Sequence, residues 1–204
     1  MFFKGNRSLH PLLPQNYNFG KRRDTFRKTL ALLTERKATT LLETGTARAG
    51  LKNCKSDGAS TIVFGKWARE NDAYLYSVDI DSIALKQAEI EIKNYNLSGH
   101  VHLKASDSIA FLKLFDQKVD FLYLDSFDYD KKDRSIQRKS QEHHLAEFKA
   151  IESRLHQGSI VLIDDHKLPG GGKGKLAIEY MTQKGWEIVM EEYQVLLSQK
   201  IIRL

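Results

Sequence analysis

Strand-like and helix-like segments alternate along the chain after residue 38, and this alternation most constrains the fold. Short apolar runs that indicate strands occupy residues 39–43, 73–78, 100–103, 119–124 and 159–163. Between them lie segments with apolar residues at helical spacing, such as Leu85, Ala88 and Ile92 in a predicted helix over 82–94. Such alternation is typical of βαβ units. The sequence therefore predicts an α/β fold with a Rossmann-like, doubly wound and mostly parallel sheet.

The last part of the chain departs from this pattern. A polar stretch at 126–141, expected as a loop, leads into a helix, and the fifth strand is followed by a glycine-rich loop and a short helix at 176–182. Two strand-like runs, 186–190 and 193–201, then close the chain with only a short turn between them. Parallel strands need a long crossover, whereas antiparallel strands do not. We therefore expect a seven-stranded sheet with a terminal antiparallel pair.

Residues 1–38 stand outside the alternation and are predicted to form a helical extension of a domain that spans 39–204. One core suits this length, because domains typically hold roughly 100–200 residues. We expect a helix near 25–33 that covers a ligand cleft or pairs subunits into a homo-oligomer. No apolar run approaches the ~20 residues of a membrane span. The first residues lack a secretory apolar stretch, and the lone Cys54 fits a reducing compartment, so we expect a cytoplasmic protein.

The formal net charge is +6, which raises the question of an anionic partner. The densest basic cluster lies at 21–28, before the first strand, and its only aromatic residue is Phe26. Basic helices of this kind are commonly solvated faces. We therefore expect a small-molecule partner rather than nucleic acid.

The run TTLLETGTARAG, from Thr39 to Gly50, indicates a strand that ends on a nucleotide-like ligand, since glycines let the backbone approach such a ligand closely. It lacks the G-x-G-x-x-G pattern of dinucleotide enzymes. The later GGGKGK segment lacks the P-loop spacing, because Pro169 and Leu176 stand where that motif needs glycine and a hydroxyl residue. Neither a nicotinamide dinucleotide nor a nucleoside triphosphate is indicated.

Acidic residues instead mark three successive βα steps. Glu43 ends the first strand, Asp79 ends the second, and Asp107 precedes the helix after the third. S-adenosylmethionine carries an ammonium group, ribose hydroxyls and an adenine amine, each of which suits a carboxylate or carbonyl acceptor. In these features the chain resembles the class I S-adenosylmethionine-dependent methyltransferases over about residues 39–201, including the terminal antiparallel pair.

The resemblance implies a set of cofactor-binding residues: Glu43, Gly45 and Thr46 at the methionine end, Asp79 at the ribose hydroxyls, and Asp107 and Ser108 beside the adenine. The loop at 47–58 is longer than in most relatives. The run LETGT followed by DGAST is similar to a small-molecule branch of the family.

Three polar residues follow the fourth and fifth strands: Asp125, Asp165 and His166. In catechol-type O-methyltransferases, residues in similar positions bind Mg²⁺, which lowers the pKa of the substrate hydroxyl. The resemblance thus implies a divalent cation, Mg²⁺ or another, held by these three side chains. Histidine is a softer ligand than the amide it replaces and suits a general base equally well. A carboxylate pair at strand ends also serves to cap loops, so these alternatives stay open.

Other polar residues receive smaller roles. His143 and His144 are adjacent on a helix and point about 100° apart, so they cannot chelate one ion together, and His144 is expected to be a packed or capping residue. Lys173 and Lys175 stand in a Gly-Lys repeat that is typical of a mobile solvated loop, with an anionic substrate group as the other reading.

The sequence after the fourth strand, Leu124 to Phe127, lacks the Asp-Pro-Pro-Tyr pattern of enzymes that methylate amino groups of bases or glutamine. We therefore expect an O-methyltransferase acting on a sugar-like or phenolic hydroxyl, with Asp125, Asp165 and His166 as its catalytic residues. The alternatives are an RNA or protein methyltransferase that uses the basic surface, and a non-catalytic S-adenosylmethionine-binding protein.

Overall fold

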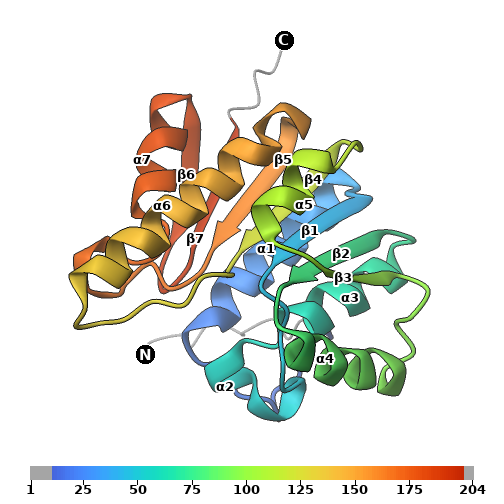
Figure 1. Cartoon of the computed structure of the whole chain (residues 1–204). Helices are drawn as coiled ribbons and strands as arrows, with labels where there is room; N and C mark the ends of the chain where they lie inside the picture. The colour runs from blue at the N-terminus through green and yellow to red at the C-terminus, as the bar shows by residue number, and fades with distance from the viewer. Residues whose placement is uncertain (1–10, 200–204) are drawn as a thin grey trace, which may run out of the picture.

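The computed structural model describes residues 11–199, and the strands in this range form one seven-stranded sheet (Figure 1). The strands are β1 (Thr40–Thr44), β2 (Tyr74–Asp79), β3 (Val101–Ala105), β4 (Val119–Leu124), β5 (Leu155–Ile163), β6 (Trp186–Glu191) and β7 (Val195–Gln199). Their order is β3-β2-β1-β4-β5-β7-β6. Strands β1 to β5 are parallel, whereas β7 runs antiparallel to β5 and β6. The predicted sheet, with its terminal antiparallel pair, is confirmed.

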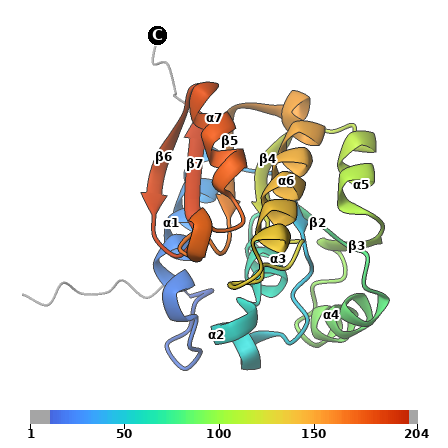
Figure 2. The same ribbon diagram turned by 60° about the vertical axis from the view of Figure 1, so that its left-hand side comes forward.

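Helices cover both faces of the sheet (Figure 1, Figure 2). They are α1 (Arg23–Arg36), α2 (Cys54–Asp57), α3 (Ser60–Glu70), α4 (Ser82–Asn94), α5 (Ser108–Leu114), α6 (Arg134–Ile151) and α7 (Lys175–Gln183). Successive side chains of a strand point to opposite faces, so the central strands feed two cores. Leu41 and Phe121 pair across β1 and β4 and pack with residues of α1 and α3. Leu42 and Leu122, one step along, pack with residues of α5, α6 and α7.

The N-terminal helix α1 is part of the first core. Phe26 makes edge-on ring contacts with Phe64 of α3 and Tyr123 of β4, at centroid distances of 5.4 and 6.3 Å. Leu30 and Leu33 are buried in the same cluster. The helix predicted near 25–33 thus lies within α1. Residues 1–10 of the predicted extension lie outside the described residues. The proposed roles of the extension, covering a cleft or pairing subunits, stay predictions.

The start of α6 differs from the sequence prediction. The helix begins at Arg134, inside the polar stretch expected as a loop, because Asp133 caps it. The carboxylate of Asp133 accepts hydrogen bonds from the backbone N–H groups of Ser135 and Ile136 at 2.8 and 3.2 Å. At the other end of the chain, β7 corresponds to the predicted strand 193–201, of which residues 200 and 201 lie outside the described range. No helix within residues 11–199 has both the length and the apolar character needed to cross a membrane.

Candidate active site

Strands β1, β2, β4 and β5 end at one edge of the sheet, and two hollows open there. Gly45, just after β1, lines both of them. Its φ angle is +83°, and a Cβ atom at this position would lie 2.4 Å from the backbone oxygen of Asp125. Only glycine therefore allows the turn after β1 to approach the end of β4 this closely.

The first hollow, here called the narrow hollow, lies beside the ends of β2 and α5. It is lined by four of the predicted cofactor residues, Gly45, Asp79, Asp107 and Ser108. Ile80 and Phe127 supply apolar walls, and the side chain of Ile80 is exposed although it is large and apolar. The hollow therefore combines carboxylates with an apolar surface, which suits a nucleoside better than a wholly polar ligand.

Backbone N–H groups hold both carboxylates of the narrow hollow in place. Asp79 accepts a hydrogen bond from the N–H of Thr46 through Oδ2 and one from the N–H of Asp81 through Oδ1, both at 2.9 Å. Asp107 caps α5 and accepts from the N–H of Ala110 at 2.8 Å. The predicted residues Thr46, Asp79 and Asp107 are thus fixed at the edge of one site.

Glu43 does not line either hollow. It is fully buried and accepts hydrogen bonds from the hydroxyls of Ser60, Thr61 and Ser77, of which the last two lie 2.6 Å from Oε2. Burial raises the pKa of Glu43 to about 7. The hydroxyl of Ser77 also lies 2.8 Å from that of Thr46. Glu43 therefore supports the loop after β1 from inside the fold, and the hydroxyl of Ser60, at the start of α3, helps to hold its carboxyl group.

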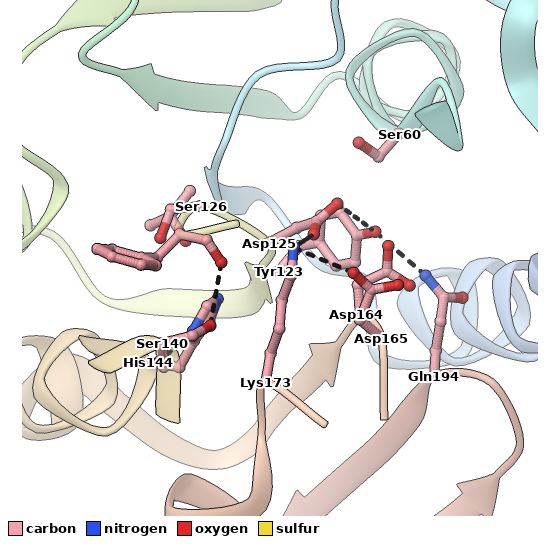
Figure 3. A network of polar contacts seen from close by, with 12 residues as sticks. Ser60, Tyr123, Asp125, Ser126, Ser140, His144, Asp164, Asp165, Lys173 and Gln194 are labelled. Atoms are coloured by element: carbon pink, nitrogen blue, oxygen red, sulfur yellow. Dashed lines mark hydrogen bonds and ion pairs between the residues drawn. The ribbon is translucent and has the colours of Figure 1, made fainter. Parts of the chain in front are cut away.

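The second hollow, here called the polar hollow, is lined by Asp125 and Asp165, which form a carboxylate cluster with the buried Asp164 at the ends of β4 and β5. Two cations reach this cluster. The Nζ atom of Lys173 lies 2.6 Å from Asp125 Oδ1 and 3.3 Å from Asp165 Oδ2 (Figure 3). The guanidinium of Arg22 lies 2.7 Å from Asp164 through Nη2 and 2.9 Å through Nε. Three carboxylates thus share two cations.

Residues just before β7 support the same cluster. The hydroxyl of Tyr193 donates a hydrogen bond to Asp165. The side-chain amide of Gln194 donates to the hydroxyl of Tyr123 at 3.1 Å, and that hydroxyl lies 3.4 Å from Asp125 Oδ2 (Figure 3). The terminal antiparallel pair therefore contributes to the site as well as to the sheet.

The pKa values of the cluster follow from this arrangement. Burial alone would lower the pKa of Lys173, but Asp125 and Asp165 outweigh burial and raise it, so the ammonium stays protonated. Burial would raise the pKa of Asp164, but the adjacent Arg22 lowers it. Burial raises the pKa of Asp125, and the neighbouring carboxylates add to this effect against the opposing pull of Lys173. Of Asp125 and Asp164, Asp125 is therefore the one better suited to accept a proton.

The predicted donor set for a divalent cation is not assembled. Asp125 and Asp165 lie together, but Lys173 bridges them, and His166 Nε2 lies 3.1 Å from Glu191. The Nδ1 atom of His166 is buried without a hydrogen-bond partner among the described residues. No group of three or more His, Cys, Asp or Glu side chains within residues 11–199 is arranged to hold a metal ion. The residues present do not fit a metal at this position.

Sequence reasoning missed the place of Lys173. A Cβ atom at Gly172 would lie 2.1 Å from the backbone oxygen of Asp165, and one at Gly174 would lie 2.6 Å from Ile163 Cγ2. The glycine-rich segment therefore packs directly on the end of β5 and carries Lys173 into the cluster, where the side chain is 4% exposed. The glycines on both sides of the lysine are the signal that could have revealed this.

His143, which was given no role in the site from the sequence, lines the narrow hollow. Its Nε2 atom lies 3.3 Å from the buried carboxylate of Glu147 and 3.2 Å from the hydroxyl of Ser108. Burial opposes the charged form, but Glu147 outweighs it and raises the pKa of His143. Its ring lies 5.4 Å from that of Phe127. Contacts between α5 and α6 create this arrangement, so no local sequence pattern predicts the position of His143.

The neighbouring His144 is buried, as predicted. Its Nδ1 atom lies 2.7 Å from the backbone oxygen of Ser140, and burial lowers its pKa to about 4. His144 therefore packs on the buried face of α6 as a neutral side chain.

Comparisons with known proteins concern the family and the fold of this chain. The sequence profile of a family described as a methyltransferase domain matches residues 56–166, which is more than half of the chain. No curated protein matches. Solved structures with a similar fold include a Staphylococcus aureus protein provisionally named a caffeoyl-CoA O-methyltransferase, with 14% identity, coverage of 87% of this chain and 83% of that one, and a TM-score of 0.64.

Two further structures contain S-adenosylhomocysteine. A methyltransferase from Podospora anserina has 14% identity, coverage of 90% and 81%, and a TM-score of 0.64. An O-methyltransferase from Bacillus cereus has 10% identity, coverage of 89% and 84%, and a TM-score of 0.61. At these identities the likeness establishes the shared fold.

Proposed function

This chain belongs to the methyltransferase-domain family, with the fold of the class I S-adenosylmethionine-dependent enzymes, and we propose on that premise that it methylates a hydroxyl of a small polar molecule. The observation that carries the proposal is the meeting of the two hollows at Gly45. A methyl donor in the narrow hollow and an acceptor in the polar hollow would face one another across this residue. Such positioning is the main contribution that an enzyme makes to a displacement between two bound molecules.

The narrow hollow suits the nucleoside part of S-adenosylmethionine. Asp79 would accept hydrogen bonds from the ribose hydroxyls, and Asp107 and Ser108 would lie beside the adenine, whose faces would contact Ile80 and Phe127. The methionine end would lie against the backbone of Gly45, which lines both hollows, and of Thr46, which lines the polar hollow. We assign Glu43 a supporting role, because its carboxylate is fully occupied by hydroxyl groups.

The polar hollow suits a hydroxyl-rich, sugar-like acceptor better than a phenolic one. Charged and hydroxyl side chains line it, among them Arg48, Asp57, Ser60 and Asp128 in addition to the cluster. A phenolic ring would need apolar walls to replace the water that it loses on binding. A sugar-like molecule would instead exchange hydrogen bonds to water for hydrogen bonds to these side chains.

The charges of the carboxylate cluster also favour methyl transfer. S-adenosylmethionine supplies an electrophilic methyl group on a positively charged sulfur. When its three carboxylates are ionised, the cluster has one more negative charge than its two cations supply, which favours a cationic donor nearby. We propose Asp125 as the group that accepts the proton of the acceptor hydroxyl, with Asp165 beside it and His166, held by Glu191, in a supporting position.

The basic cluster at 21–28 gives little support to an RNA or protein substrate. Arg22 is buried against Asp164, and Arg23 donates hydrogen bonds to the backbone oxygens of Leu13 and Pro14 at 2.7 and 3.0 Å. These two side chains serve the fold. Only a measurement of turnover distinguishes the proposed enzyme from a non-catalytic S-adenosylmethionine-binding protein.

Calorimetric titration with S-adenosylmethionine and S-adenosylhomocysteine tests the cofactor assignment. We expect micromolar binding to the wild-type protein, loss of binding in Asp79→Ala, and no change in Asp116→Ala, a control at an exposed position. A screen of sugar-like, phenolic, RNA and peptide acceptors then tests the substrate class. Absence of binding to the wild-type protein contradicts the proposal, and binding without any methylated product supports the non-catalytic alternative.

A further inference from the structure

The bridge that Lys173 makes between Asp125 and Asp165 is built into the fold. The ammonium contacts one oxygen of each carboxylate, and the side chain is almost wholly buried although the residue lines the polar hollow. A lysine that pairs with a carboxylate at the surface would be free to move into water. This one has its charge confined to the space between the two carboxylates.

The loop that carries Lys173 is fixed from both sides. Gly172 and Gly174 pack against the end of β5 at distances that no larger residue would allow. On the outer side, the amide of Gln141 in α6 donates hydrogen bonds to the backbone oxygens of Gly170 and Gly172, both at 3.1 Å. The lysine is therefore presented by a rigid segment rather than by a solvated loop.

Arg22 is the second cation of the cluster, and it competes little with Lys173 for the same carboxylates. Its principal partner is Asp164, and its distance to Asp165 is 3.8 Å. Asp125 and Asp165 are thus left to Lys173. A divalent cation between them would lie next to an ammonium and close to a guanidinium, and like charges at such distances repel strongly in a buried site.

We propose that Lys173 is the resident cation of the acceptor site and replaces a divalent metal ion in methyl transfer. This inference rests on the proposed function. The ammonium of Lys173 would donate a hydrogen bond to the acceptor oxygen while the proton of that hydroxyl group passes to Asp125. An electron pair of that oxygen would form the bond to the methyl carbon while the carbon–sulfur bond breaks and its electron pair stays on sulfur. The products are the methyl ether, S-adenosylhomocysteine and one proton, with no redox change.

Binding of Mn²⁺, measured by electron paramagnetic resonance on the chelator-treated full-length protein, tests the proposal without any need for turnover. We expect no specific Mn²⁺ binding to the wild-type protein. Lys173→Met removes the ammonium and leaves Asp125 and Asp165 facing each other, so this variant should gain one Mn²⁺ site. Lys175→Met, which removes an exposed charge two residues away, should behave as the wild type does.

Thermal unfolding gives a second measurement if Lys173→Met folds poorly. Mn²⁺ well above its Kd should raise the melting temperature of this variant by about 5 °C or more and leave that of the wild type unchanged. Stoichiometric binding of Mn²⁺ or Mg²⁺ to the wild type overturns the proposal, as does a folded Lys173→Met variant that shows no response to either ion. A failure to bind S-adenosylmethionine would contradict the proposed function and would not alter these metal measurements.

Discussion

Arg22 and Asp164 are separated by 142 residues in sequence, and their side chains form a buried ion pair in which Nε and Nη2 both donate to the carboxylate. Arg22 also lies 4.9 Å above the ring of Tyr193 and 3.4 Å from the backbone oxygens of Lys55 and Ser56. One side chain thus joins the start of α1, helix α2 and the end of β5.

Replacement of Arg22 by methionine should destabilise the protein strongly, because it leaves Asp164 buried without its cation. We expect a loss of about 3–5 kcal/mol in the free energy of unfolding, measured with urea. Arg27→Met, which removes an exposed charge from α1, should cost less than about 1 kcal/mol. Addition of Asp164→Asn to the Arg22 variant should recover part of the loss. Equal effects of the two arginine substitutions would contradict this account.

The buried carboxyl of Glu43 should make stability depend on pH. Because burial raises its pKa from 4.5 to about 7, the folded state holds this proton more tightly than the unfolded state does. The resulting stabilisation is fully present below pH 4.5 and is lost as the pH rises to about 7, by on the order of 3 kcal/mol. Glu43→Gln should flatten this part of the profile in urea unfolding at a series of pH values. Parallel profiles for variant and wild type would count against the buried, protonated state.

His143 should contribute to cofactor binding through its position between Phe127 and Ser108. We expect His143→Ala to weaken S-adenosylhomocysteine binding about tenfold, the effect of losing roughly one hydrogen bond and its packing. His156→Ala is a matched control, because that histidine pairs with Asp120 near the opposite ends of β4 and β5. Calorimetry measures the affinity of both variants. An unchanged affinity in His143→Ala would show that His143 does not contribute to cofactor binding.

The turn at Gly45 should tolerate no side chain. Alanine at this position would place its Cβ atom against the backbone of Asp125 and would adopt a φ of +83°, which strains any residue other than glycine. We expect Gly45→Ala to lose at least about 1–3 kcal/mol of stability, together with cofactor binding. A Cβ atom at Gly99 meets nothing within 4 Å, so Gly99→Ala should retain both properties. A Gly45 variant that binds normally would show that the turn can move away from β4.

Periodicity was sufficient to predict the sheet, because strands such as β4 are buried on both faces and helices such as α4 carry a clear apolar stripe. It also placed Asp79, Asp107 and Asp125 correctly at strand and helix ends. The start of α6 could not be read in the same way. Its first turns face the solvent and carry polar residues, so that only the cap at Asp133 marks the boundary.

The roles of individual side chains were harder to predict than their positions. Glu43 was expected at the cofactor, but its orientation depends on hydroxyls from α3 and β2. Lys173 was expected in solvent, but close packing of its glycine neighbours on β5 decides otherwise. Such contacts join segments that are far apart in sequence, so local composition carries only indirect signs of them.

The support of the carboxylate cluster by residues from both ends of the described chain has a consequence for synthesis. Arg22 is among the earliest residues of the fold to leave the ribosome, whereas Tyr193 and Gln194 are among the last. A nascent chain that extends just past β5 to Asp165 still lacks the hydroxyl and amide groups that hold Asp165 and Tyr123. The carboxylate cluster can therefore reach its full set of contacts only after Tyr193 and Gln194 have been synthesised.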